Sequence, residues 1–292
     1  MSNLSAPHFH DEEKAYEYVE ARIWASGVVC PHCGCVEHAG KLKGKTTRPG
    51  LWKCYECRKP FTVKIGTIFE DSKVPMRLWL QAMYLIAGSK KGISSNQLHR
   101  ILGVTLKTAW FMSHRIREAM REGDFAIPMG GDGGIVEVDE TFIGRIKGMP
   151  KKAAYHHKMK VLSLVDRNTK RARSVVIQDT RADTILPIVA ANVSREATIM
   201  TDEHHAYNNL AAIYAGHGRT VHRAGQYVDP ANHQIHSNTV EGYFSIFKRG
   251  MRGVYQHCGE QHLHRYLAEF DFRYNNRDAL EVNDKRRADR IL

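Results

Sequence analysis

Apolar residues change their spacing near residue 134, and the change divides the chain into a helical part and a part built of strands. From Pro75 onward, apolar side chains recur at the intervals of three and four that mark one face of an α-helix; they are Leu78, Trp79, Ala82, Met83, Leu85 and Ile86. After a glycine-rich linker at residues 129–134, short apolar runs rich in β-branched residues predict strands. We expect these strands at residues 135–142, 160–165, 172–177 and 198–200.

The order of the later elements predicts an α/β fold of the ribonuclease-H-like type over residues 133–279. A helix through Ile185 and Val189 separates the third strand from the fourth, and a helix around residues 207–214 and a short strand near Val221 follow. Three strands, a helix, a strand and further helices favour a single α/β sheet. In such a sheet the first and fourth strands can lie side by side, so residues at their ends would meet.

Residues 71–126 carry the signals of a helix-turn-helix region. Ser94 and Gln97 form a capping box that opens one helix, and Gly103 ends it. Thr105 can cap a second helix, on whose surface we place the basic residues Lys107, His114, Arg115 and Arg117. Two helices joined by a short glycine turn, the second of them basic, fit the DNA-binding geometry of this motif. An ordinary helical bundle remains open as the alternative, because the motif has few fixed residues.

Two C-x-x-C pairs, Cys30 with Cys33 and Cys54 with Cys57, stand about 20 residues apart. This spacing predicts one structural zinc ion held by four thiolates. In a reducing compartment cysteines gathered in this way favour metal binding over disulfide bonds. Cys35 lies close enough to compete as a ligand.

Positive charge is concentrated in the predicted zinc ribbon, residues 18–70, and in the chain as a whole. The stretch between the cysteine pairs can contact DNA or another protein, or the zinc can serve folding alone; its basic residues are Lys41, Lys43, Lys45 and Arg48. Lysine and arginine number 43 against 31 aspartate and glutamate, which gives a net charge of +12 and a pI of about 9.4. Such an excess favours a polyanion, first of all nucleic acid, although a basic enzyme without that partner stays open on charge alone.

The chain shows no sign of a secretory or membrane-spanning segment. Residues 1–14 are polar and acidic, and the most apolar helical stretch, Leu78 to Ala87, is too short to cross a bilayer. We therefore expect a cytoplasmic protein, associated with the nucleoid, that has no membrane partner.

Three acidic residues suggest the chemistry of the second half of the chain. Asp139 ends one apolar run, Asp202 follows another, and Glu241 lies in a helical segment. Two carboxylates on neighbouring strand ends and a third on a packed helix can hold a pair of hard divalent cations. Taken singly, each has an ordinary alternative: a solvated strand end, a helix N-cap or a surface glutamate. Glu241 stands out because it shares a polar helical face with Asn238, Ser245 and Lys248.

Taken in order, these motifs resemble a bacterial insertion-sequence transposase of the DDE type with an N-terminal zinc ribbon, the insertion-sequence family fifteen-ninety-five. The resemblance runs from about Tyr18 to Arg277. Besides the two cysteine pairs it rests on the segments Lys91-Gly92-Ile93-Ser94-Ser95, Val138-Asp139-Glu140-Thr141, Thr201-Asp202-Glu203 and His236-Ser237-Asn238-Thr239-Val240-Glu241-Gly242.

The resemblance implies an enzyme that binds the terminal inverted repeats of a transposon, cleaves the ends to free 3′-hydroxyl groups and joins them to target DNA. It makes Asp139, Asp202 and Glu241 the ligands of two Mg²⁺ or Mn²⁺ ions, in addition to the structural Zn²⁺. Asn238 offers only an amide oxygen, which magnesium binds less well than a carboxylate, so we expect it to support the ligands or to contact DNA.

The partners implied are double-stranded DNA, as transposon ends and as target, and a second copy of the chain in a homodimer or higher oligomer. The residues expected to contact DNA are Lys248, Asn238, Lys107, Arg115, Arg117, Lys151 and Lys152. Two rival interpretations keep DNA as the partner: a zinc-ribbon, helix-turn-helix regulator whose second domain is not catalytic, and a structure-selective nuclease of the same fold that cuts without joining.

Overall fold

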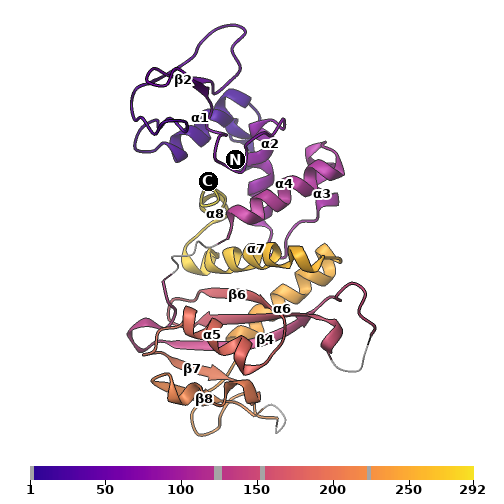
Figure 1. The fold of residues 1–292 in the computed structure, drawn as a ribbon. Helices are drawn as coiled ribbons and strands as arrows, with labels where there is room; N and C mark the ends of the chain where they lie inside the picture. Colours follow the sequence, from indigo (N-terminus) through magenta and orange to yellow (C-terminus); the bar gives the residue numbers. More distant parts are fainter. Residues whose placement is uncertain (1–2, 122–126, 152–154, 222–224) are drawn as a thin grey trace. The chain divides into compact units, whose positions relative to one another are not determined.

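The computed structural model describes residues 3–121, 127–151, 155–221 and 225–292. The chain forms two compact units. One consists of Met1–Ala119 together with Val282–Leu292, and the other of Met120–Glu281 (Figure 1). Lys152, one of the expected DNA contacts, lies outside the described residues.

The first unit joins a small antiparallel sheet to a set of helices. Its sheet has the strand order β1-β2-β3, and β2 pairs with both neighbours. The C-terminal helix α8 packs against α2, and Arg287 Nη1 on α8 donates a hydrogen bond to the Ala87 carbonyl at 3.1 Å. The elements of this unit are η1 Asn3–Ser5, η2 Pro7–Phe9, α1 Glu12–Ile23, β1 Ala39–Lys41, β2 Trp52–Cys54, β3 Pro60–Phe61, α2 Met76–Gly88, α3 Ser95–Leu102, α4 Leu106–Ala119 and α8 Asp284–Asp289.

Helix α3 begins and ends, and helix α4 begins, at the residues that the sequence predicted. Ser94 Oγ accepts a hydrogen bond from the Gln97 amide at 3.2 Å, and Gly103 ends α3 in the left-handed conformation with φ of 66°. Thr105 Oγ1 accepts from the Thr108 amide at 3.1 Å at the start of α4. Side chains therefore satisfy the free amides at both helix starts.

The surface placement of His114 and Arg117 on α4 is wrong. Arg117 is 0% exposed and His114 is 4% exposed; Arg117 Nη1 donates to Ser113 Oγ at 3.1 Å. Both belong to the buried stripe that starts at Ala109, since Arg117 follows Ala109 by eight positions and Ser113 by four. The positive charge of these side chains suggested that they face solvent, whereas the helical period places them on the buried face of α4.

The second unit is a mixed α/β domain with a five-stranded sheet. The strand order is β6-β5-β4-β7-β8 (Figure 1). β4 pairs antiparallel with β5 and parallel with β7, β5 pairs antiparallel with β6, and β7 pairs parallel with β8. The expected pairing of the first and fourth strands is therefore confirmed. The strands are β4 Ile135–Ile143, β5 Met159–Asp166, β6 Ala172–Ile177, β7 Thr198–Thr201 and β8 Gly216–Arg219.

Helices and short turns complete the second unit. They are η3 Gly131–Gly133, η4 Tyr155–His157, α5 Ala182–Asn192, η5 His205–Tyr207, η6 Leu210–Ala212, α6 Asn238–Gly250, the π-helix η8 Met251–Tyr255, η9 Glu260–His262, α7 Leu263–Asn275 and η10 Asp278–Leu280. The helix expected around residues 207–214 is instead the pair of 3₁₀ turns η5 and η6, separated by Asn208 and Asn209. Asparagine side chains compete for backbone hydrogen bonds and so disfavour a continuous helix. The last strand, expected near Val221, ends at Arg219.

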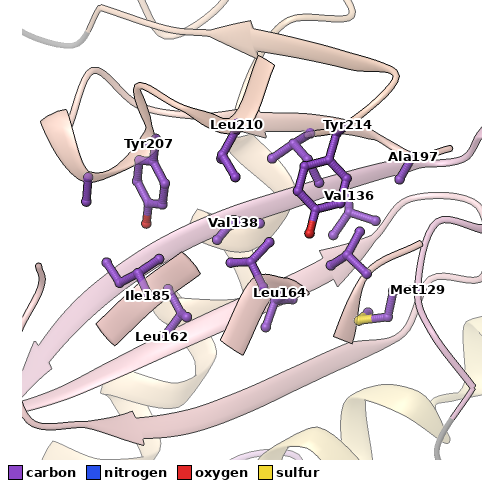
Figure 2. Close-up of a cluster of buried hydrophobic side chains, with 14 of the residues drawn as sticks. Met129, Val136, Val138, Leu162, Leu164, Ile185, Ala197, Tyr207, Leu210 and Tyr214 are labelled. Atoms are coloured by element: carbon purple, nitrogen blue, oxygen red, sulfur yellow. The ribbon is translucent and has the colours of Figure 1, made fainter. Parts of the chain in front are cut away.

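Both faces of the five-stranded sheet are covered by apolar side chains. Val136 and Val138 of β4 lie in one core cluster with Ile185 of α5 (Figure 2). On the other face, Ile143 of β4 lies in a cluster with residues of α6 and α7, including Phe247 and Leu267. Alternate residues of β4 thus face two different cores, and an acidic residue in this strand must find polar partners on its own side. Among the described residues, no helix is both long and apolar enough to cross a membrane.

Candidate functional site

The four predicted zinc ligands come together in the first unit. Cys30 and Cys57 have sulfur atoms 3.7 Å apart, and so do Cys33 and Cys54. In a tetrahedral site with Zn–S bonds of about 2.3 Å the sulfurs are separated by about 3.8 Å, whereas a disulfide needs about 2.05 Å. The donor set and its spacing therefore fit one zinc ion.

Backbone geometry shapes the first cysteine pair. The Gly34 amide donates to the Cys30 carbonyl at 2.9 Å and the Cys30 amide donates to the Cys35 carbonyl at 2.9 Å. Gly34 has φ of 75°, as expected for a tight turn. Cys35 does not join the four-cysteine group; its ligand atom lies instead within 4.8 Å of those of His38 and Glu56.

In the second unit, the strand register sets Asp139 beside Asp202. The parallel pairing of β4 and β7 matches Ile135 with Thr198 and continues to Glu137 with Met200. The same offset, carried two positions further, brings Asp202 opposite Asp139 just beyond the end of β7. Two acids that are distant in sequence thus meet at one point of the sheet.

Glu241 reaches this region from the first turn of α6, whose start is fixed to β4. Glu137 on β4 is 0% exposed. It accepts hydrogen bonds from the Val240 amide at 2.8 Å and from Arg167 Nε at 2.6 Å. Glu241 Oε1 accepts from Ser237 Oγ at 3.2 Å. A buried ion pair on the strand therefore holds the helix turn that carries the third acid.

Three other acids act electrostatically on Asp139. Burial raises the pKa of Asp139 well above its usual value, and the negative charges of Glu140, Asp202 and Glu241 raise it further. Burial lowers the pKa of Lys248, while the charge of Asp139 acts in the opposite direction. Because such interactions weaken with distance, Asp202, Glu241 and Lys248 lie near enough to Asp139 to interact with it electrostatically.

Glu140 is a site residue that the sequence analysis missed. Its side chain leaves β4 on the opposite side from that of Asp139. It accepts a hydrogen bond from the hydroxyl of the fully buried Tyr207. Its pKa is raised by burial, against which the Tyr207 hydrogen bond acts, and the charge of Asp202 raises it further. The available signal was a third acid, after Glu137 and Asp139, in a strand whose other residues are mostly apolar.

The three acids are not gathered as closely as the four cysteines. Among the described residues, the groups whose ligand atoms all lie within 4.8 Å of one another are the two cysteine-containing groups, and Asp139, Asp202 and Glu241 do not form such a group. Oxygens that bind one Mg²⁺ at about 2.1 Å lie at most about 4.2 Å apart.

The other residues expected to contact DNA have varied surroundings. Lys107, Lys151 and Asn238 are exposed, and Lys248 is partly buried. Arg115 is exposed, but its Nη1 donates to the carbonyls of Ile68 at 3.1 Å and Glu70 at 2.6 Å. Arg117 is buried and cannot reach a DNA surface from its position in α4.

The second unit is a mixed α/β domain that carries the three acids, and the first unit contains a ribbon with four clustered cysteines. Residues 132–275 match the family described as ISXO2-like transposase domain, and residues 10–60 match the family described as transposase zinc-ribbon domain. The chain belongs to this family of insertion-sequence transposases with a zinc ribbon.

A full-length relative agrees with this assignment. A protein in transposable element ISH50 of Halobacterium salinarum is 27% identical over 284 residues, which cover 91% of this chain and 91% of that protein. Among solved structures, a chain in the cryoEM structure of the simian T-cell lymphotropic virus intasome, in complex with PP2A regulatory subunit B56 gamma, matches with a TM-score of 0.30 and 15% identity. This match covers 60% of the present chain and 63% of the solved one, and at this TM-score it carries no functional argument.

Proposed function

We propose that this transposase binds the terminal inverted repeats of its transposon, cleaves the ends to free 3′-hydroxyl groups and joins those groups to target DNA. The single observation that carries the proposal is the placement of the three acids: the β4–β7 register, continued two residues, sets Asp202 opposite Asp139, and the Glu137–Val240 hydrogen bond ties the turn that carries Glu241 to β4. Such a group of carboxylates is stable at neutral pH when cations neutralise it, and carboxylate oxygens are the ligands that Mg²⁺ and Mn²⁺ prefer.

The three acids would hold two divalent ions, with Asp139 between Asp202 and Glu241. Bound ions of this kind activate the attacking oxygen and neutralise charge on the leaving oxygen. No side-chain nucleophile is then needed. The residues of the chain supply position: β4 and β7 fix the first two acids, and the Glu137–Arg167 pair fixes the turn of α6 that carries the third.

Positive side chains at the edge of the acids would bind the DNA backbone. Burial lowers the pKa of Lys248, Asp139 acts against this, and the charges of Arg252 and Lys158 lower it further, so these three cations interact with one another. Lysine and arginine contacts to phosphates give affinity without base specificity. Exposed Lys107 on α4, and the neighbouring surface of α3 and α4 in a helix-turn-helix arrangement, would read the terminal repeats.

The fold supports the same proposal at the level of topology. Three antiparallel strands followed by two parallel ones in the order β6-β5-β4-β7-β8 agree with a ribonuclease-H-like sheet. Because two transposon ends must be processed together, we propose that the active form is a homodimer or a larger assembly on DNA.

Cleavage and joining of DNA by the purified, zinc-loaded protein test the proposal. With a duplex that carries the terminal repeat of the element, Mg²⁺ should produce a cut with a free 3′-hydroxyl, and a pre-cleaved end should be joined to a target plasmid. Asp139→Asn should abolish both reactions and leave end binding nearly intact, whereas Asp183→Asn, at an exposed position on α5, should be active. Cutting without joining would indicate a nuclease, and binding without either reaction would indicate a regulator.

A further inference from the structure

Tyr207 is a buried residue with one specific polar contact. It is 0% exposed and belongs to the core cluster between the sheet and α5 (Figure 2). Its hydroxyl donates a hydrogen bond to Glu140 Oε2. A buried tyrosine usually finds a partner for its hydroxyl, but here the partner is the carboxylate directly next to Asp139 in the chain.

The same carboxylate lies close to the segment that carries Asp202. His204 Nδ1 lies 3.7 Å from Glu140 Oε1, and the His204 amide donates to Asp202 Oδ1 at 2.9 Å. The Glu140 amide, in turn, donates to Asp139 Oδ1 at 2.7 Å. Glu140 therefore stands at the centre of contacts that run from one acid to the other.

We propose that Tyr207 is a positioning residue, whose hydroxyl holds Glu140 on its own side of β4 and thereby fixes the turn of Asp202 opposite Asp139. The inference rests on the proposed function, because it assumes that Asp139 and Asp202 bind metal together. Residues that orient the ligands of a metal are often as important as the ligands themselves. Without the hydroxyl, Glu140 loses its hydrogen bond to Tyr207. The carboxylates of Asp139 and Asp202 are then held less firmly relative to each other.

Tyr214 provides a matched control in the same core. It belongs to the same cluster as Tyr207 (Figure 2), is 6% exposed, and its hydroxyl makes no hydrogen bond within the described part of the chain. Tyr207→Phe and Tyr214→Phe therefore remove the same atom from the same core, but only Tyr207→Phe removes a contact to Glu140.

Binding of Mn²⁺ alone to the full-length, zinc-loaded protein without DNA tests the proposal, with free Mn²⁺ measured by electron paramagnetic resonance. Mn²⁺ prefers oxygen ligands and does not displace zinc from thiolates. Tyr207→Phe should raise the dissociation constant on the order of 10-fold, and Tyr214→Phe should leave it at the wild-type value. A merely structural role would lower the thermal midpoint of Tyr207→Phe without changing Mn²⁺ affinity below that midpoint.

Equal affinities of Tyr207→Phe and Tyr214→Phe would overturn the positioning role while leaving the proposed function in place. Asp139→Asn separates the two questions: if it binds Mn²⁺ as well as the wild type does, the acids hold no ion and both proposals fall. Should Tyr207→Phe fail to fold, Glu140→Gln and Glu140→Leu replace it. Gln keeps an oxygen acceptor for the Tyr207 hydroxyl, so Glu140→Gln should bind Mn²⁺ more tightly than Glu140→Leu, and equal binding would contradict the inference.

Discussion

Arg167 is the residue at which one substitution should disconnect the start of α6 from the sheet. Its guanidinium donates to Glu137 at 2.6 Å, to the Gln234 carbonyl at 2.6 Å and to the His236 carbonyl at 2.7 Å. Its side chain is 16% exposed and that of Glu137 is 0% exposed. Arg167→Ala would leave a buried carboxylate without its cation.

The cost of this change can be worked out from the burial of the pair. Removing one partner of a buried ion pair costs about 3–5 kcal/mol. The second unit spans Met120–Glu281, and in a domain of that size 1 kcal/mol shifts the thermal midpoint by about 2–4 °C. Arg167→Ala should therefore lower the midpoint of this unit by about 6–20 °C. The start of α6 would loosen with it, and the Mn²⁺ affinity of the site should fall because Glu241 lies in that turn.

Scanning calorimetry of the zinc-loaded protein at pH 7 measures the shift. Arg181→Ala is the control, because Arg181 forms an exposed pair with Asp179 at 3.8 Å that solvent screens. The double variant Glu137→Gln, Arg167→Met removes both charges and keeps an acceptor for the Val240 amide, so it should recover much of the loss. A midpoint for Arg167→Ala no lower than that of Arg181→Ala would refute the reasoning.

Three further predictions concern zinc, pH and DNA. Removing zinc, or changing Cys54→Ser, should unfold residues 28–62, because the binding energy of structural zinc, about 10–16 kcal/mol, also stabilises the fold. Amide hydrogen exchange in this segment should then become fast, and exchange that stays slow would contradict the prediction. The raised pKa of Asp139 favours its protonated form in the folded state, so the metal-free protein should lose stability as pH rises through that pKa. The thermal midpoint of metal-free Asp139→Asn should therefore be higher than that of the wild type at neutral pH and equal to it in acid. A difference between the two midpoints that grows as the pH falls would contradict this prediction. Lys248→Met should weaken end binding and reduce its salt slope by about one, whereas an unchanged slope would remove Lys248 from the phosphate contacts.

Local patterns in the sequence predicted the elements and ligands that depend on near neighbours. The caps at Ser94 and Thr105 and the end at Gly103 were predictable because each depends on residues within one helical turn. The pairing of β4 with β7 was expected from the order of elements, because the first and fourth strands of such an α/β sheet can lie side by side. The zinc site was predictable because the spacing of its cysteines is itself the geometric requirement.

Contacts between distant segments could not be predicted from the sequence. Nothing near Glu140 indicated that Tyr207 would reach it across the unit, and nothing near Glu137 indicated Arg167 as its partner. Arg117 was misplaced for a different reason: its charge was given more weight than its position in a buried helical stripe. Charged residues in an apolar pattern mark positions where a partner from elsewhere in the fold must be found.

The most direct test of the central claim, that Asp139, Asp202 and Glu241 hold divalent ions together, is anomalous scattering from crystals of the protein grown with Mn²⁺. The account predicts anomalous density for Mn²⁺ bound to Asp139. Asp202 and Glu241 should also contact this density. Density confined to other parts of the chain, such as the group of Cys35, His38 and Glu56, would contradict it.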